Sequence, residues 1–170
     1  MAVATAFVCP FDGAVSSAEL VDVVRPFAAA GVAAVYLADT IGRAGPRQVT
    51  EAVAAVRAAF PELPLGLHLH DTYGRALANA WAGLLQGVAL FDSAVGGIGG
   101  CPFAPGAAGN VATEDLVELM HSCGLPTGID LDRVDEANEV LSAELGRRLD
   151  TVTGRARRSS RRAAEAVGAR

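Results

Sequence analysis

The sequence predicts an α/β fold with a parallel sheet, in which about four β-strands alternate with α-helices. Short apolar runs alternate along the chain with segments whose apolar residues recur at helical spacing. Hydrophobic residues make up 51% of the 170 residues, which suits strands buried on both faces. Right-handed crossovers between parallel strands then place the helices against the sheet.

The first part of the chain contains one strand–helix unit and the strand of the next. A short apolar run predicts a strand over residues 3–8. Ser16 is expected to cap a helix, because Glu19 follows three residues later and completes a capping box. Gly31 is expected to end this helix, and the apolar run 32–38 is expected to form a buried strand.

The middle of the chain repeats this alternation. Pro46 suits the first turn of a helix, and the run 65–70 predicts a third strand. A third helix is expected to end at Gly87, and residues 88–95 are expected to form a fourth strand. The apolar positions that indicate the two helices are Val49, Val53, Val56 and Phe60, and then Leu77, Trp81 and Leu84.

The last part of the chain is predicted to be helical. Thr113 is expected to cap a helix, and a further helix is expected over 131–145. We expect residues 1–146 to form one α/β region and residues 147–170 to form an Arg-rich tail, helical or disordered. The tail contains eight Arg against two acidic residues, so its net charge is +6 and that of the remaining residues is −11. It has no interleaved aromatics to stack on bases, so no nucleic-acid partner is predicted.

Composition also limits the location of the protein. The chain has no uninterrupted apolar stretch of about 18 residues, so no membrane partner is expected. Its three cysteines, Cys9, Cys101 and Cys123, show no disulfide spacing, which favours free thiols in a reducing compartment. The expected location is therefore cytoplasmic.

Polar residues at the ends of the predicted strands favour one architecture. The alternating pattern fits an open doubly wound sheet or part of a (β/α)8 barrel. Asp39, His68, His70, Asp92 and Ser93 lie at or near carboxyl ends of predicted strands. Barrel enzymes carry their chemistry at that edge. Open sheets do so too, so this placement supports a barrel without excluding the alternative.

His68 and His70 form the most specific pattern in the chain. Side chains alternate along a strand, so the two imidazoles face one side, while Leu67 and Leu69 face the other. Two imidazoles on one face can bind one divalent ion, although the spacing alone favours core histidines bonded to backbone carbonyls. Asn110 could add an oxygen ligand, but lone asparagines in loops usually make turns.

A glycine-rich segment follows the fourth predicted strand and leads to Cys101. Its four glycines between residues 96 and 100 permit sharp bending and close approach to a ligand. A cysteine presented there could act as an acid, a base or a nucleophile, or could be a structural thiol. The segment does not fit a dinucleotide-binding motif, because Pro102 occupies the position of the third required glycine. We expect Cys9 and Cys123 to be more buried than Cys101.

These segments together resemble the 3-hydroxy-3-methylglutaryl-CoA lyase family of the DRE-TIM metallolyase superfamily. The resemblance covers roughly residues 3–145. Its matching segments are Cys9 to Gly13, Ala38 to Gly42, His68 to Gly74, Ala76 to Asn79, Asp92 to Asn110 and Ala112 to Val117. The glycine loop that ends in Cys101 distinguishes this family from the related Claisen condensing enzymes.

The resemblance implies the identity of the site residues and the reaction. It implies that His68, His70 and Asn110 bind Mg²⁺ or Mn²⁺, that Cys101 is the catalytic cysteine and that Asp39 is an active-site acid. The implied reaction is a retro-Claisen cleavage of 3-hydroxy-3-methylglutaryl-CoA to acetyl-CoA and acetoacetate, as in leucine degradation and ketone-body formation. The implied partner is an acyl-CoA substrate.

The resemblance also implies an incomplete barrel. The chain matches the family from its fifth strand onward, so the expected fold is the C-terminal half of a (β/α)8 TIM barrel. The family's first strand carries an Arg-Asp pair, which is absent from this chain. We therefore expect self-association or a separate N-terminal half. Two alternatives remain open: a non-catalytic remnant or interaction module, and a related acyl-CoA lyase or condensing enzyme.

Overall fold

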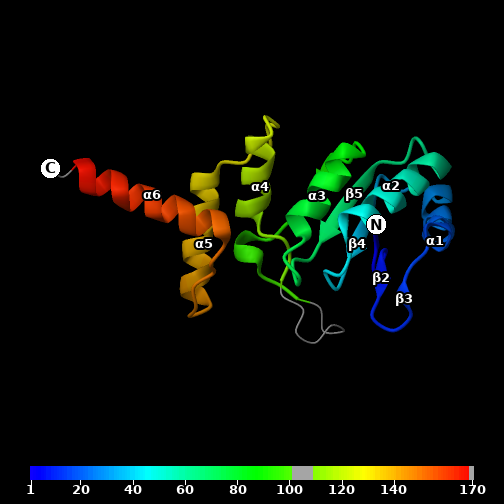
Figure 1. Cartoon of the computed structure of the whole chain (residues 1–170), viewed down its shortest axis with the longest axis horizontal. Helices are drawn as coiled ribbons and strands as arrows, with labels where there is room; N and C mark the ends of the chain where they lie inside the picture. Colours follow the sequence, from blue (N-terminus) through cyan, green and yellow to red (C-terminus); the bar gives the residue numbers. More distant parts are fainter. Residues whose placement is uncertain (101–108, 169–170) are drawn as a thin grey trace. The chain divides into compact units, whose positions relative to one another are not determined.

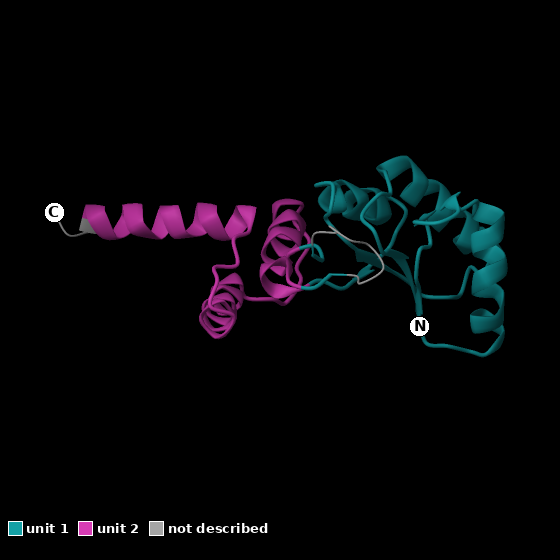
Figure 2. Ribbon diagram, turned by 90° about the horizontal axis from the view of Figure 1, so that it is seen from below, with its two compact units in different colours: residues 1–93, 99–111 teal, residues 94–98, 112–170 magenta. Residues whose placement is uncertain are grey.

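The computed structural model describes residues 1–100 and 109–168, which divide into two compact units (Figure 2). Unit 1 comprises residues 1–93 and 99–111, and unit 2 comprises residues 94–98 and 112–170. No single boundary in the sequence separates the two units. Residues 94–98 belong to unit 2, the chain then returns to unit 1 over residues 99–111, and the rest of unit 2 begins at residue 112. The predicted boundary at residue 146 stays a prediction.

Unit 1 is built on a four-stranded parallel sheet, as the alternating pattern predicts (Figure 1). The strands lie in the order β1-β4-β5-β6. The two central strands have five residues each and pair in full register, from Val35 opposite Leu65 to Asp39 opposite Leu69. The strand bounds are Ala2–Val3 for β1, Val35–Asp39 for β4, Leu65–Leu69 for β5 and Leu90–Phe91 for β6.

Three helices of unit 1 bury one face of this sheet. They are α1 (Ser17–Ala29), α2 (Pro46–Ala59) and α3 (Ala76–Leu85). The side chains of Val35, Leu37, Leu65, Leu67 and Leu69 on alternate strand positions are fully or almost fully buried. Because strand side chains alternate, the intervening strand residues Tyr36, Ala38, Gly66 and His68 lie on the opposite face.

The predicted helix boundaries of unit 1 are confirmed. Ser16 caps α1, its hydroxyl accepts a hydrogen bond from the Glu19 N–H, and the Glu19 side chain bonds the Ser16 N–H in return. Pro46 is the first residue of α2. The predicted apolar stripe of α3 is only partly buried, because Trp81 is exposed and the small residues of the helix pack inward instead.

Two predicted strands are shorter in the structure than in the sequence analysis. The strand expected over 3–8 is divided, because Thr5 has a φ of 52° that no strand accommodates. Val8–Cys9 instead forms β2, which pairs antiparallel with β3 (Gly13–Ala14). The strand expected over 88–95 is reduced to Leu90–Phe91.

Unit 2 contains a short 3-10 helix, η1 (Val95–Gly97), and three α-helices. The helices are α4 (Thr113–Ser122), α5 (Leu131–Glu144) and α6 (Val152–Gly168). The predicted cap of α4 is wrong by one residue, because Ala112 occupies the cap position and Thr113 is the first helical residue. The Arg-rich segment forms α6, so it is helical through residue 168. None of the helices in the described residues has the length and apolar character needed to cross a lipid bilayer.

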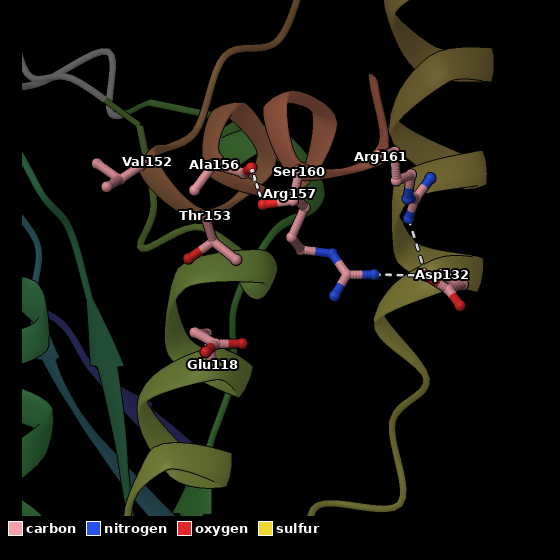
Figure 3. A pocket seen from close by; sticks show the side chains of 8 residues that line it. All are labelled: Glu118, Asp132, Val152, Thr153, Ala156, Arg157, Ser160 and Arg161. Carbon is pink, nitrogen blue, oxygen red and sulfur yellow. Dashed lines mark hydrogen bonds and ion pairs between the residues drawn. The ribbon is translucent and has the colours of Figure 1, made fainter. Parts of the chain in front are cut away.

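An ion-pair network joins α6 to α5 beside a cavity of about 480 Å³ (Figure 3). Arg157 bonds Asp135 at 2.9 Å and Asp132 at 2.5 Å. Arg161 bonds Asp132 at 2.8 Å and also contacts Asp135. Asp135 is almost fully buried, so its two guanidinium partners supply the polar environment that burial removes.

The Asp135→Ala variant is expected to lower the free energy of unfolding by about 2 kcal/mol, because two guanidinium groups lose their shared buried partner. Urea denaturation followed by circular dichroism measures this loss. Glu136→Ala is the control, since Glu136 is the exposed neighbour on the same helix. Equal unfolding midpoints for the two variants would show that the network contributes no stability.

Candidate active site

His68 and His70 lie at the carboxyl end of β5, on the sheet face that the three helices of unit 1 do not cover. Their ring centroids are 5.2 Å apart, and the ring planes meet at 65°. The side chain of His68 is 30% exposed, whereas His70 is buried. The structure therefore presents one imidazole at the surface and the other directly behind it, on the shared face predicted from their spacing.

Asp92 orients the His68 ring. The Nδ1 of His68 lies 2.8 Å from Oδ1 of Asp92, just after the neighbouring strand β6. This hydrogen bond raises the pKa of His68 above its ordinary value, and the negative charge of Asp92 acts in the same direction, while desolvation opposes both. With Nδ1 engaged, Nε2 is the ring atom left to bind a ligand. The place of Asp92 at a strand end is predicted from the sequence, whereas its pairing with His68 is not.

Backbone pairing brings Asn110 to His70. The two residues form an isolated antiparallel bridge, and the flanking bonds run from Asp71 N–H to Gly109 O at 3.1 Å and from Val111 N–H to Leu69 O at 2.8 Å. The chain between them is 39 residues long, so this contact depends on tertiary structure alone. The three predicted metal ligands therefore lie at one end of one strand.

Gly99 shapes the space in which the Asn110 amide lies. A Cβ atom at Gly99 would lie 2.5 Å from Nδ2 of Asn110, closer than any two such atoms approach. Position 99 therefore requires a glycine, because any side chain there would collide with the Asn110 amide. The position of Asn110 beside the histidines thus depends on the glycine-rich segment that the sequence analysis singled out.

The donor set fits a hard or borderline divalent cation. Two imidazole nitrogens and one amide oxygen are ligand types that Mg²⁺ and Mn²⁺ sites use together with water. In the residues that the structure describes, no group of three His, Cys, Asp or Glu side chains could hold a metal ion.

Asp39 lies at the end of β4 and is 1% exposed. Its carboxylate accepts hydrogen bonds from the backbone N–H groups of Arg43 at 3.0 Å and Ala44 at 3.1 Å. Burial raises the pKa of the Asp39 carboxyl above its ordinary value, and the hydrogen bonds from Ala44 and Arg43 oppose that change. These bonds give Asp39 a structural part in the β4–α2 loop, and its assignment as an active-site acid stays a prediction.

The predicted catalytic cysteine, Cys101, lies outside the described residues. Of the other two thiols, Cys123 is exposed and Cys9 is half-buried. The expectation that both are more buried than Cys101 stays a prediction. Cys123 directly follows the last residue of α4, where the chain leaves the helix.

Comparison with known proteins decides the family of this chain. The HMGL-like family model matches residues 1–141. The chain belongs to the HMGL-like family. The (R)-citramalyl-CoA lyase of Chloroflexus aurantiacus is 45% identical over 156 residues, which are 92% of this chain and 49% of that protein. The hydroxymethylglutaryl-CoA lyase of Pseudomonas mevalonii is 45% identical over 138 residues, which are 81% of this chain and 46% of that protein.

A solved lyase structure gives the architecture of this HMGL-like chain. The lyase from Acinetobacter baumannii, in complex with coenzyme A and 3-methylmalate, superposes with a TM-score of 0.84 and 44% identity. The match covers 91% of this chain and 51% of that structure. The four parallel strands and their helices therefore form half of a lyase TIM barrel, as predicted. The chain spans about half the length of the curated relatives it matches.

Proposed function

We propose that this chain carries the metal-binding part of a divalent-metal-dependent carbon–carbon lyase that cleaves 3-hydroxy-3-methylglutaryl-CoA to acetyl-CoA and acetoacetate. The observation that carries the proposal is the meeting of His68, His70 and Asn110 at the end of β5. The 45% identity to a hydroxymethylglutaryl-CoA lyase supports the reaction. We also propose that the protein acts in leucine degradation and is located in the cytoplasm.

The proposed site residues divide the work of binding and proton transfer. A bound Mg²⁺ or Mn²⁺ would act as a Lewis acid toward the hydroxyl oxygen of the substrate. His68 and His70 would hold that ion through ring nitrogens, and Asp92 keeps the His68 ring turned toward it. Asn110 would supply an amide oxygen. In the cleavage a base takes the hydroxyl proton, the C2–C3 bond breaks, and its electron pair forms the enolate of acetyl-CoA. This enolate then takes a proton, for which the thiol of Cys101 is the proposed donor.

A second candidate function has its own support. The identity to the (R)-citramalyl-CoA lyase is also 45%, and it extends over 92% of this chain. Both lyases break a carbon–carbon bond beside a hydroxyl-bearing carbon of an acyl-CoA. Parallel assays with the two acyl-CoA thioesters separate the candidates, because the cleavage products differ: acetoacetate from one and pyruvate from the other.

Mn²⁺ binding tests the proposed site directly. Calorimetric titration of the folded chain is expected to give weak binding, with a dissociation constant at least tenfold higher for His70→Ala and for His68→Ala, because each loses one ligand. Asn110→Ala is expected to weaken binding in the same direction. These variants need the same circular dichroism spectrum as the wild type, because His70 is buried.

His121→Ala is the matched control for that titration. It is the third histidine of the chain, and it lies on α4, where its ring bonds Thr127 at 3.0 Å. Its removal is expected to leave Mn²⁺ affinity unchanged. If His68→Ala and His121→Ala bind Mn²⁺ equally well, His68 is not a ligand and the proposed metal site is wrong.

A further inference from the structure

Two loops of unit 1 emerge side by side above the candidate metal ligands. One loop joins β4 to α2 and the other joins β5 to α3. Their parent strands are paired neighbours, so the residues that follow Asp39 and those that follow His70 lie at the same edge of the sheet. We call the side chains of Arg43, Tyr73 and Arg75 on these loops the arginine rim.

Hydrogen bonds hold both loops in place. The Asp39 carboxylate binds the N–H groups of Arg43 and Ala44. The Asp71 carboxylate accepts the N–H of Ala76 at 2.8 Å, at the start of α3. Arg75 donates from Nη1 to the carbonyl oxygen of Arg43 at 3.3 Å, which joins one loop to the other. These bonds fix the backbones of the two loops and tie the Arg75 side chain across them.

The two loops also touch through their backbones. A Cβ atom at Gly42 would lie 2.8 Å from both the backbone N and the Oγ1 of Thr72. Glycine at this position lets the loops approach to a distance that no other residue would allow. The close approach brings the side chains that follow Gly42 and Thr72 to the same place.

The arginine rim gathers positive charge on one aromatic ring. The guanidinium carbons of Arg43 and Arg75 lie 5.8 Å and 5.6 Å from the ring centroid of Tyr73. Tyr73 is 53% exposed, and both arginines are exposed. In residues 1–100 and 109–168, neither arginine forms an ion pair with a carboxylate.

Two other arginines of unit 1 are paired with carboxylates within their own helices, whereas Arg57 donates to the carbonyl oxygen of Gly87. Arg25 pairs with Asp22 at 2.9 Å, and Arg47 lies 3.8 Å from Glu51. Arg43 and Arg75 instead face the same ring, where two like charges repel each other unless an anion lies between or beside them. Guanidinium groups match phosphate oxygens in geometry and charge, and they stack on aromatic faces at the same time.

We propose that the arginine rim binds the phosphate groups of the acyl-CoA substrate. This inference rests on the proposed function for the identity of the substrate, and it assigns the anchoring of its nucleotide end to Arg43 and Arg75. The rim lies at the strand edge that carries His68 and His70, so one ligand can place its phosphates on the rim while its acyl end approaches the histidines. Tyr73 keeps the two guanidinium groups oriented.

Binding of three related compounds to the chain tests this proposal. Coenzyme A carries a diphosphate and a 3′-phosphate, dephospho-coenzyme A carries the diphosphate alone, and pantetheine carries neither. Affinity measured by calorimetry at low salt is expected to fall in that order. The Arg43→Gln/Arg75→Gln double variant is expected to bind coenzyme A roughly tenfold more weakly, since charge-assisted hydrogen bonds are lost. Its affinity for pantetheine is expected to remain that of the wild type.

A double variant of matched charge provides the control. Arg25→Gln/Arg47→Gln removes two exposed arginines from the same unit, so it changes the net charge equally. It is expected to bind coenzyme A as the wild type does. Equal losses in the two double variants, wild-type affinity in Arg43→Gln/Arg75→Gln, or no binding of coenzyme A by the folded wild type would each overturn the proposal.

The outcome separates this inference from the proposed lyase activity. Loss of coenzyme A affinity in the rim variant, together with no dependence of Mn²⁺ binding on His68, would support the rim and contradict the metal site. The reverse pattern would support the metal site and overturn the rim. The two experiments use different ligands and different residues, so neither result follows from the other.

Discussion

The Glu114→Ala variant is expected to lower the free energy of unfolding by about 3 kcal/mol. Glu114 is fully buried in unit 2, and both of its carboxyl oxygens accept hydrogen bonds from Gly96 N–H, at 2.9 Å and 3.1 Å. The Nδ2 of Asn138 donates to the same carboxyl at 2.6 Å and to the carbonyl of Leu149 at 3.2 Å. Removal of Glu114 therefore takes the acceptor from the part-buried Gly96 N–H and from one N–H of the buried Asn138 amide, which keeps its bond to Leu149.

The network around Glu114 joins segments that are distant in sequence. It connects η1, at the root of the glycine-rich segment, with α4 and α5. Ser142 extends it, because its hydroxyl donates to Oδ1 of Asn138 at 3.0 Å and accepts the N–H of Leu149 at 3.0 Å. We therefore expect the Gly96 amide to exchange its hydrogen much faster in Glu114→Ala than in the wild type.

Two further variants make this prediction specific. Glu114→Gln is expected to lose less stability than Glu114→Ala, because one amide oxygen still accepts while the new NH₂ group faces donors. Glu118→Ala, one helical turn later and exposed, is expected to unfold within about 0.5 kcal/mol of the wild type. Chemical denaturation of the three variants measures the order, and equal midpoints for Glu114→Ala and Glu118→Ala would contradict it.

The second large effect is expected when the missing half of the barrel is supplied. The chain alone is expected to show no normal Mn²⁺-dependent cleavage of 3-hydroxy-3-methylglutaryl-CoA. Mixed with a polypeptide that carries the N-terminal half of the Pseudomonas mevalonii lyase, it is expected to turn over at least about a hundredfold faster, because misplaced or solvated catalytic groups cost at least that factor. Coupled assay of acetoacetate release measures the gain.

The physical reason is the open face of the sheet. Leu90 is 37% exposed and Tyr36 is half-buried, and the side chains of His68 and Asp92 are 30% and 52% exposed. Covering this face removes apolar surface from water, which contributes about 25 cal/mol per Å². The same surface is expected to drive self-association of the isolated chain, which light scattering detects.

The short outer strands change how that association is expected to occur. The strands expected over 3–8 and 88–95 would have left two long open edges, but β1 and β6 have two residues each. Short edge strands offer few unpaired backbone groups, so the apolar face and not the sheet edge is expected to form the contact.

The His70→Ala chain mixed with the same N-terminal half is the control for turnover. A monomeric wild-type chain with full turnover would contradict both expectations.

Local signals in the sequence determined most of the helical elements. The capping box of Ser16 and Glu19 and the proline at position 46 set where α1 and α2 begin, because caps act through bonds between near neighbours. Alternation along the strand placed His68 and His70 on one face. The polar residues at strand ends indicated the edge of the sheet on which the candidate site lies.

Only the tertiary structure decided which of these residues meet. Asn110 reaches His70, Asp92 reaches His68, and Glu114 reaches Gly96 through strand register and loop closure. Arg43 and Arg75 meet at one ring because β4 and β5 are neighbours in the sheet. Periodicity reports which side of its own element a residue faces, whereas these contacts depend on how separate elements pack, which no local pattern encodes.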